Sequence, residues 1–179
     1  MRIMTIIFIF IFSCINASYL EMEAFDEEGD VIFNGKLISY PDADLVYASI
    51  LQRNNTTIFI AKVKGEMKKS IYCEFNINND WIIYYKGGKI FIYNKNSEGG
   101  EEKNAKYSIK RNVLKIFLPK TFEIKNVTVK IDMKKGKSWC IDRITSEKWH
   151  IIEKRKSGVI GAIFVAFIIA ILKVYYKYK

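Results

Sequence analysis

Apolar and polar residues alternate with a period of two through the middle of the chain. Val127, Val129 and Ile131, for example, fall on one face of an extended segment. This alternation is typical of a β-strand that buries one face. Comparable runs cover residues 45–53, 57–64, 70–78, 81–86, 89–95, 106–110, 113–118, 126–133 and 138–144.

Short polar or glycine-containing segments separate these runs. Gly87-Gly88 tolerates the positive φ that a two-residue hairpin turn requires. Asn54-Asn55 and Arg111-Asn112 supply turn residues at two other junctions. About eight or nine strands at intervals of roughly ten residues predict an all-β fold, an antiparallel β-sandwich, for residues 45–146.

The segments on either side of this domain have weaker patterns. Residues 18–44 hold eight Asp and Glu against one Lys. We predict that they form an acidic N-terminal segment with one short edge strand at residues 31–33. Residues 147–156 are predicted to be a juxtamembrane stalk or the first turns of a membrane helix.

An apolar run near the N-terminus predicts a signal helix. Residues 3–12 follow Arg2, and their run of about ten residues is too short to span a bilayer. We therefore predict a signal peptide over residues 1–17, cleaved after Ala17. An uncleaved anchor and lipidation at Cys14 are the alternatives.

A second apolar run lies near the C-terminus. Residues 157–172 contain no charged residue, and with the residues that follow they are long enough to cross a membrane. We predict a transmembrane helix over residues 157–176 and a cytoplasmic tail over residues 177–179. Lysines flank both ends of the helix, so the signal peptide decides the orientation. The prediction is a single-pass protein of the cell membrane with its N-terminal domain extracytoplasmic.

The net charge of +10 does not indicate a nucleic-acid partner. Residues 45–156 carry 24 Lys and Arg against 11 Asp and Glu, and most of the bases are lysines spread singly over the alternating segments. A nucleic-acid site requires a denser basic patch. Dispersed lysines are typical of the solvated face and edge strands of a sheet.

Three stretches carry a family resemblance. They are Asp42-Ala-Asp-Leu-Val-Tyr-Ala-Ser, Ile82-Ile-Tyr-Tyr-Lys-Gly-Gly-Lys-Ile-Phe-Ile-Tyr and Ser108-Ile-Lys-Arg-Asn-Val-Leu-Lys-Ile-Phe-Leu-Pro. Their order resembles the β-sandwich superfamily of DOMON domains and family-nine carbohydrate-binding modules in archaeal or bacterial surface proteins. The resemblance covers about residues 40–145 and implies a sandwich that binds a sugar or haem.

The residues present favour neither ligand strongly. Haem-binding members use a Met and a His as axial ligands, and the single His of this chain, His150, is placed outside the predicted domain. A sugar site needs aromatic platforms, for which core or cross-strand packing is the alternative explanation. The candidate sugar-binding residues are Trp81, Tyr84, Tyr93 and Trp139.

Asn76, Asn78 and Asp80 stand where the family has an Asp-rich turn. Side-chain oxygens at alternate positions suit calcium, so these residues are the candidate metal ligands. The charge that they supply is small, and a plain Asx turn explains them better. No other cofactor is expected.

Cys73 and Cys140 are candidates for a disulfide in an extracytoplasmic domain, with two packed thiols as the alternative. Asn54, Asn55 and Asn126 begin Asn-x-Ser/Thr sequons and are candidate glycosylation sites.

No nucleophile and base can be paired along the chain, so an enzyme is not expected. The sequence favours a non-catalytic binding or structural module of the cell surface. Its expected partners are the membrane lipid and a cell-surface protein or carbohydrate. The alternatives are a carbohydrate- or metal-binding receptor or accessory subunit of an envelope or transport complex and, disfavoured, a haem electron-transfer domain.

Overall fold

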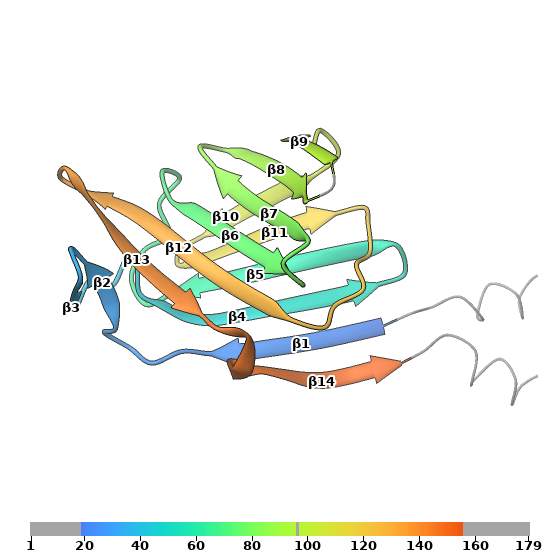
Figure 1. Cartoon of the computed structure of the whole chain (residues 1–179), viewed down its shortest axis with the longest axis horizontal. Helices are drawn as coiled ribbons and strands as arrows, with labels where there is room; N and C mark the ends of the chain where they lie inside the picture. Colours follow the sequence, from blue (N-terminus) through green and yellow to red (C-terminus); the bar gives the residue numbers. More distant parts are fainter. Residues whose placement is uncertain (1–18, 96, 156–179) are drawn as a thin grey trace, which may run out of the picture.

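The computed structural model describes residues 19–95 and 97–155, and this part of the chain is an all-β structure of two antiparallel sheets (Figure 1). The six-stranded sheet has the order β10 (Lys106–Lys110), β11 (Val113–Leu118), β5 (Thr56–Val63), β4 (Leu45–Arg53), β1 (Tyr19–Phe25) and β14 (Trp149–Arg155). The eight-stranded sheet has the order β3 (Lys36–Ile38), β2 (Val31–Phe33), β13 (Ser138–Ile144), β12 (Val127–Lys135), β6 (Tyr72–Ile77), β7 (Trp81–Lys86), β8 (Lys89–Asn94) and β9 (Ser97–Glu101). A 3₁₀ turn, η1 (Ser146–Lys148), precedes β14.

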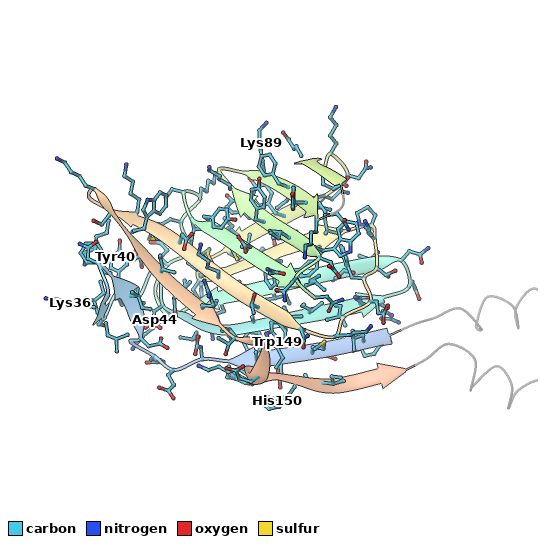
Figure 2. The ribbon with its side chains drawn as sticks, in the orientation of Figure 1. Lys36, Tyr40, Asp44, Lys89, Trp149 and His150 are labelled. Atoms are coloured by element: carbon cyan, nitrogen blue, oxygen red, sulfur yellow. The ribbon has the colours of Figure 1, made fainter. Side chains whose placement is uncertain are left out.

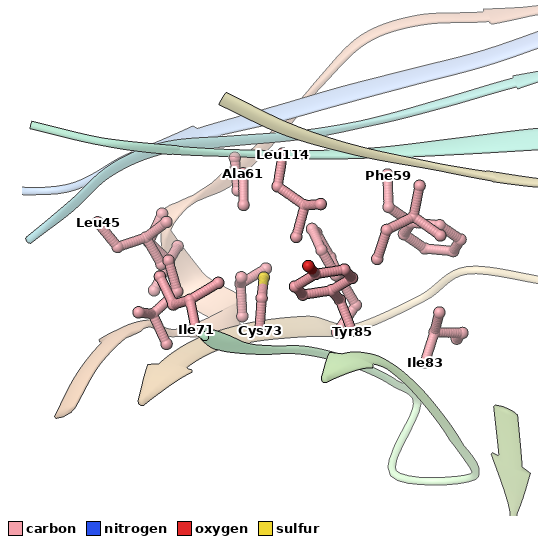
Figure 3. Close-up of a cluster of buried hydrophobic side chains, with 14 of the residues drawn as sticks. Leu45, Phe59, Ala61, Ile71, Cys73, Ile83, Tyr85 and Leu114 are labelled. Atoms are coloured by element: carbon pink, nitrogen blue, oxygen red, sulfur yellow. The ribbon is translucent and has the colours of Figure 1, made fainter. Parts of the chain in front are cut away.

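The core lies between the two sheets because each strand turns one set of alternating side chains inward. Figure 3 shows Phe59 and Leu114 of the six-stranded sheet facing Cys73 and Tyr85 of the other. The rings of Phe59 and Phe75 meet across the interface with 5.0 Å between their centroids. Each large apolar side chain that is fully buried in this way contributes about 1.5–3 kcal/mol of stability. The all-β, two-sheet architecture predicted from the alternation is confirmed.

The strand count is higher than the alternation predicted. The described residues contain fourteen strands, whereas about eight or nine were expected. The acidic segment provides three of them, including β2 at the position predicted for an edge strand. However, β2 pairs with β3 on one side and with β13 on the other, so it is an inner strand and not an edge strand.

Two strands at the ends of the described chain pair with each other. β1 lies between β4 and β14, with Met22 and Ala24 buried and Glu23 on the opposite face. β14 occupies most of the segment predicted to be a stalk, and Trp149 packs against the core. His150 therefore lies within the domain, opposite Glu23 of β1, and not outside it as the sequence suggested.

Four connections between the sheets meet at one end of the sandwich. Residues 26–30 join β1 to β2, residues 39–44 join β3 to β4, residues 64–71 join β5 to β6, and the turn η1 joins β13 to β14 (Figure 1). Segments that are remote in the sequence are thereby brought together, which positions one of the sites described below.

The predicted signal peptide (residues 1–17), transmembrane helix (157–176) and tail (177–179) lie outside the described residues. Within residues 19–95 and 97–155, no helix has the length and apolar character needed to cross a membrane.

Candidate functional site

Aromatic side chains gather on the outer face of the eight-stranded sheet. Tyr72 of β6, Tyr84 of β7 and Phe91 of β8 alternate with inward-facing core residues, so they point away from the core. Tyr84 and Phe91 stand opposite each other and stack with 4.9 Å between ring centroids and 12° between planes. On the other side of Tyr84, the ring centroid of Tyr72 lies 5.4 Å from that of Tyr84. The three rings form a continuous apolar surface across three strands.

An open hollow of about 760 Å³ lies over these rings. Besides the three aromatic side chains, its lining includes Glu74, Ile82, Lys86, Tyr93, Gly99 and Gly100. The arrangement combines flat aromatic surfaces with an acid and a base. Such surfaces bind ligands that have both apolar faces and polar edges.

Two features fix the shape of the hollow. The Tyr72 hydroxyl donates a hydrogen bond of 2.5 Å to Oε2 of Glu74, and burial together with this carboxylate raises the pKa of the Tyr72 phenol. At the other side Gly99 allows Tyr93 to approach the backbone of β9. A Cβ atom at position 99 would lie only 2.5 Å from Cδ2 of Tyr93.

The four aromatic residues predicted as a sugar platform do not form one site. Tyr84 and Tyr93 line the hollow. Trp81 packs against the core, edge-on to Phe122 at 5.6 Å, and Nζ of Lys120 lies 3.6 Å above its ring. Trp139 is 51 % exposed on β13, which is separated from β7 by β12 and β6.

Sequence reasoning missed Tyr72, Glu74, Lys86 and Phe91. The sequence held a signal for the two aromatic residues, because Tyr72 and Phe91 occupy alternating positions of their strands that point away from the core. The adjacency of β6 and β8 to β7 follows from the hairpins that join them.

Calcium binding by Asn76, Asn78 and Asp80 stays a prediction, and within this turn Asn78 has a structural role. Asn78 has a left-handed backbone with φ of 57°. Its Oδ1 accepts hydrogen bonds from the backbone N–H groups of Lys125 (2.8 Å) and Asn126 (3.0 Å). Its Nδ2 donates to the Glu123 carbonyl at 2.7 Å. Asn78 thus fastens the connection between β11 and β12, and its oxygen is already engaged.

The predicted disulfide is wrong. Cys73 and Cys140 are both buried and free. Cys73 pairs with Ile131 and Cys140 with Met133 on opposite sides of β12. Two strand spacings and an offset of two residues along β12 separate their Cα atoms by about 12 Å, beyond the roughly 7 Å that a disulfide can span. Burial raises the pKa of both thiols, which keeps them protonated.

The three predicted glycosylation sites are at the surface. Asn54 and Asn55 occupy the exposed turn between β4 and β5, and Asn126 is exposed just before β12. Their modification stays a prediction.

A group of aspartates that the sequence analysis did not single out lies where the connections between the sheets meet. Asp26 follows β1, Asp30 precedes β2, and Asp142 points inward from β13. Each contributes a carboxylate oxygen to a group in which the three oxygens lie within 4.8 Å of one another. Asp44, fully buried in the connection before β4, lies at the same end of the sandwich (Figure 2). We call these four residues the aspartate cluster.

Polar contacts hold the aspartate cluster in place. Oδ2 of Asp142 accepts a hydrogen bond from the Leu45 N–H at 2.6 Å, which links β13 of one sheet to β4 of the other. Oδ2 of Asp44 accepts from the Gly29 N–H at 2.8 Å. Oδ1 of Asp26 forms an ion pair with Nζ of Lys148.

The environment of the aspartate cluster disfavours charge. Burial, with the nearby charges of Asp30 and Asp26, raises the pKa of Asp142 to about 7. Burial is also the main cause that raises the pKa of Asp30 and of Asp44. Removing carboxylates from water and placing them beside one another both oppose ionisation. No single sequence motif predicts this cluster, because its members come from three separate segments: the connection 26–30, the connection 39–44 and strand β13.

Comparisons of this chain with protein-family models, with curated proteins and with solved structures gave no significant match.

Proposed function

We propose that the chain is a non-catalytic binding module of the cell surface that holds its ligand in the outer hollow of the eight-stranded sheet. The observation that carries this proposal is the aromatic surface of Tyr72, Tyr84 and Phe91 at the base of an open hollow. These rings lie on the side of the sheet away from the core, so core packing does not account for them.

Carbohydrate is the ligand class that this surface suits best. Sugar rings present apolar C–H faces that pack on aromatic rings, and their hydroxyl groups need polar partners at the edges. Glu74 and Lys86 supply an acceptor and a donor at the margin of the hollow. The resemblance to carbohydrate-binding sandwiches agrees with this ligand class.

The predicted signal peptide and apolar segment 157–176 complete the proposal, because the first directs export of the module and the second anchors it to the outer side of a membrane. Tyr19 and Arg155 are paired at one end of neighbouring strands. A single attachment at that end leaves the hollow, which spans β6 to β9, open to the surroundings.

Binding of the full-length chain to an array of neutral and acidic oligosaccharides tests the proposal. We expect retention of at least one saccharide class, and a loss of at least tenfold in affinity in the Tyr84→Ala variant. Trp139→Ala is the matched control, because Trp139 is an exposed aromatic residue of the same sheet outside the hollow. Binding to no saccharide, or equal binding by wild type and Tyr84→Ala, would refute the carbohydrate site.

A further inference from the structure

We propose that Asp26, Asp30 and Asp142 form a calcium site between the two sheets. One oxygen from each lies within 4.8 Å of the others. Ca²⁺ binds oxygen at about 2.3–2.6 Å, so two ligands on opposite sides of the ion are about 4.6–5.2 Å apart. The three oxygens are therefore close enough to share a single ion.

Unsatisfied oxygens give independent support for a ligand. Oδ2 of Asp26, Oδ1 of Asp30 and Oδ1 of Asp44 are buried and find no hydrogen-bond partner among the described residues. The side chain of Asp26 is 0 % exposed. A buried carboxylate oxygen without a partner costs free energy, and a bound cation removes this cost by coordinating it.

The charge balance also calls for a cation. The aspartate cluster brings four carboxyl groups together, and Lys148 forms an ion pair with one of them. Lys64 lies nearby, but its ammonium group is 2.5 Å from the Glu28 carboxylate. A divalent ion neutralises the remaining negative charge without requiring the aspartates to take up protons.

The donor atoms select the kind of metal. All three ligands are carboxylates, with no His or Cys in this group, which favours a hard cation over zinc or copper. Two of the three lie in the irregular residues at the ends of β1 and β2. Ca²⁺ accepts such variable geometry and completes its shell with water or carbonyl oxygens, whereas Mg²⁺ demands a strict octahedron.

The location defines what the ion does. Asp26 extends from the six-stranded sheet, and Asp142 belongs to the eight-stranded sheet. An ion held by both joins the sheets at the end where four connections meet. The calcium site lies between the sheets beside β2 and β13, whereas the proposed sugar hollow lies on the outer face over β6 to β9. The two proposals therefore stand or fall separately.

Calorimetric titration and thermal unfolding of the full-length chain in detergent test the inference. The protein is first treated with EDTA and dialysed, and then CaCl₂ is added. We expect about one Ca²⁺ ion bound per chain and a thermal midpoint raised by about 5 °C or more at saturating calcium. No heat of binding and no shift of the midpoint would overturn the site, and an equal response to Mg²⁺ would overturn its assignment to calcium.

Two variants locate the ion. Asp30→Asn removes one charged ligand, and we expect calcium affinity to fall at least tenfold. Because this change relieves repulsion between buried acids, the calcium-free variant should unfold at the same temperature as calcium-free wild type or higher. Asp80→Asn is the matched control, since Asp80 belongs to the turn that the sequence had indicated for calcium, and it should bind as wild type does. If Asp80→Asn lowers calcium affinity and Asp30→Asn leaves it unchanged, the proposal is overturned.

A crystallographic measurement needs no variant. Crystals of the full-length chain soaked in Tb³⁺, a calcium substitute, should give one anomalous peak within coordination distance of Asp26, Asp30 and Asp142. A peak at Asn76–Asp80 alone, or no peak at all, would overturn the site.

Discussion

At the scale of single residues, Gly99 determines how closely β9 approaches the aromatic surface. A Cβ at this position would lie 2.5 Å from Cδ2 and 3.0 Å from Cα of Tyr93. We expect Gly99→Ala to shift Tyr93 and cost about 1–3 kcal/mol, as overpacking generally does. Gly100→Ala is the control, because a Cβ there meets nothing within 4 Å. Urea unfolding of both variants measures the difference, and equal stabilities would contradict this role of Gly99.

Asn78 is the second residue whose side chain organises its surroundings. Its carboxamide makes hydrogen bonds to Glu123, Lys125 and Asn126. Asn78→Ala removes these bonds and places Ala in a left-handed conformation, so it should destabilise the domain by about 2–3 kcal/mol.

Asn79→Ala separates the two causes of that loss. Asn79 has nearly the same backbone conformation, with φ of 61°, and is exposed. Its replacement should cost about 1 kcal/mol, which is the contribution of backbone strain alone. If thermal unfolding shows the same loss for both variants, the hydrogen bonds of Asn78 contribute nothing.

At the scale of elements, strand β12 keeps the two buried cysteines apart. Cys73 and Cys140 flank it on different strands, so reducing agents should leave the thermal midpoint unchanged. Peptide mapping after maleimide treatment should find both thiols unmodified in the folded protein and modified after unfolding, because burial excludes the reagent and raises their pKa. A disulfide between the two in non-reduced protein would contradict the strand order.

The alternation of residues predicted most strands between residues 45 and 144, because each has one buried and one solvated face. It failed where burial is less regular. In β1 the acidic Glu21 and Glu23 obscured the inward-facing Met22 and Ala24. In β14 the adjacent Ile151 and Ile152 are both exposed. Pairing between β1 and β14, more than a hundred residues apart in the sequence, makes these segments strands, and no local pattern reports it.

The residues of the two candidate sites, like the strands, could be predicted only where a local sequence pattern indicates them. Tyr84 and Tyr93 were named as candidate sugar-binding aromatic residues, and they line the same hollow because their strands form a hairpin; their contact with a ligand stays a prediction. The position of Trp81 could also have been read locally, since it shares the parity of the buried Ile83 and Tyr85. The aspartate cluster could not have been predicted from a local pattern, because only the arrangement of the sheets brings Asp26 and Asp142 together.

At the scale of the whole molecule, the pairing of β1 with β14 joins the two ends of the described chain. Glu23 and His150 are opposite each other, and paired Cα atoms in antiparallel strands are about 4.5–5.5 Å apart, within the range of a disulfide. Oxidised Glu23→Cys/His150→Cys protein should therefore be more stable than its reduced form by about 2–4 kcal/mol, because the bond closes a loop that spans most of the domain.

Glu23→Cys/Ile152→Cys is the control for this crosslink. Two residues along β14 displace the second Cα by about 6–7 Å along the strand, and with the separation of the strands the two Cα atoms are about 8 Å apart, beyond the roughly 7 Å reach of a disulfide. Gel mobility of non-reduced protein and guanidinium unfolding measure the outcome. Efficient crosslinking in the control and not in the first variant would contradict the register of β1 and β14.

The adjacency of Tyr19 and Arg155 also has a mechanical consequence. A tension that draws these two residues apart separates β14 from β1 one residue pair at a time. The hydrogen bonds between the strands then break in succession, and their resistance to the tension is weak. A tension between Arg155 and the hollow over β6 to β9 also enters through β14, but when it runs along the strand it loads the hydrogen bonds to β1 together, and it continues through the packed side chains between the sheets. The domain should thus open easily when its two ends are separated, and resist more strongly when a ligand in the proposed hollow pulls against the proposed C-terminal anchor.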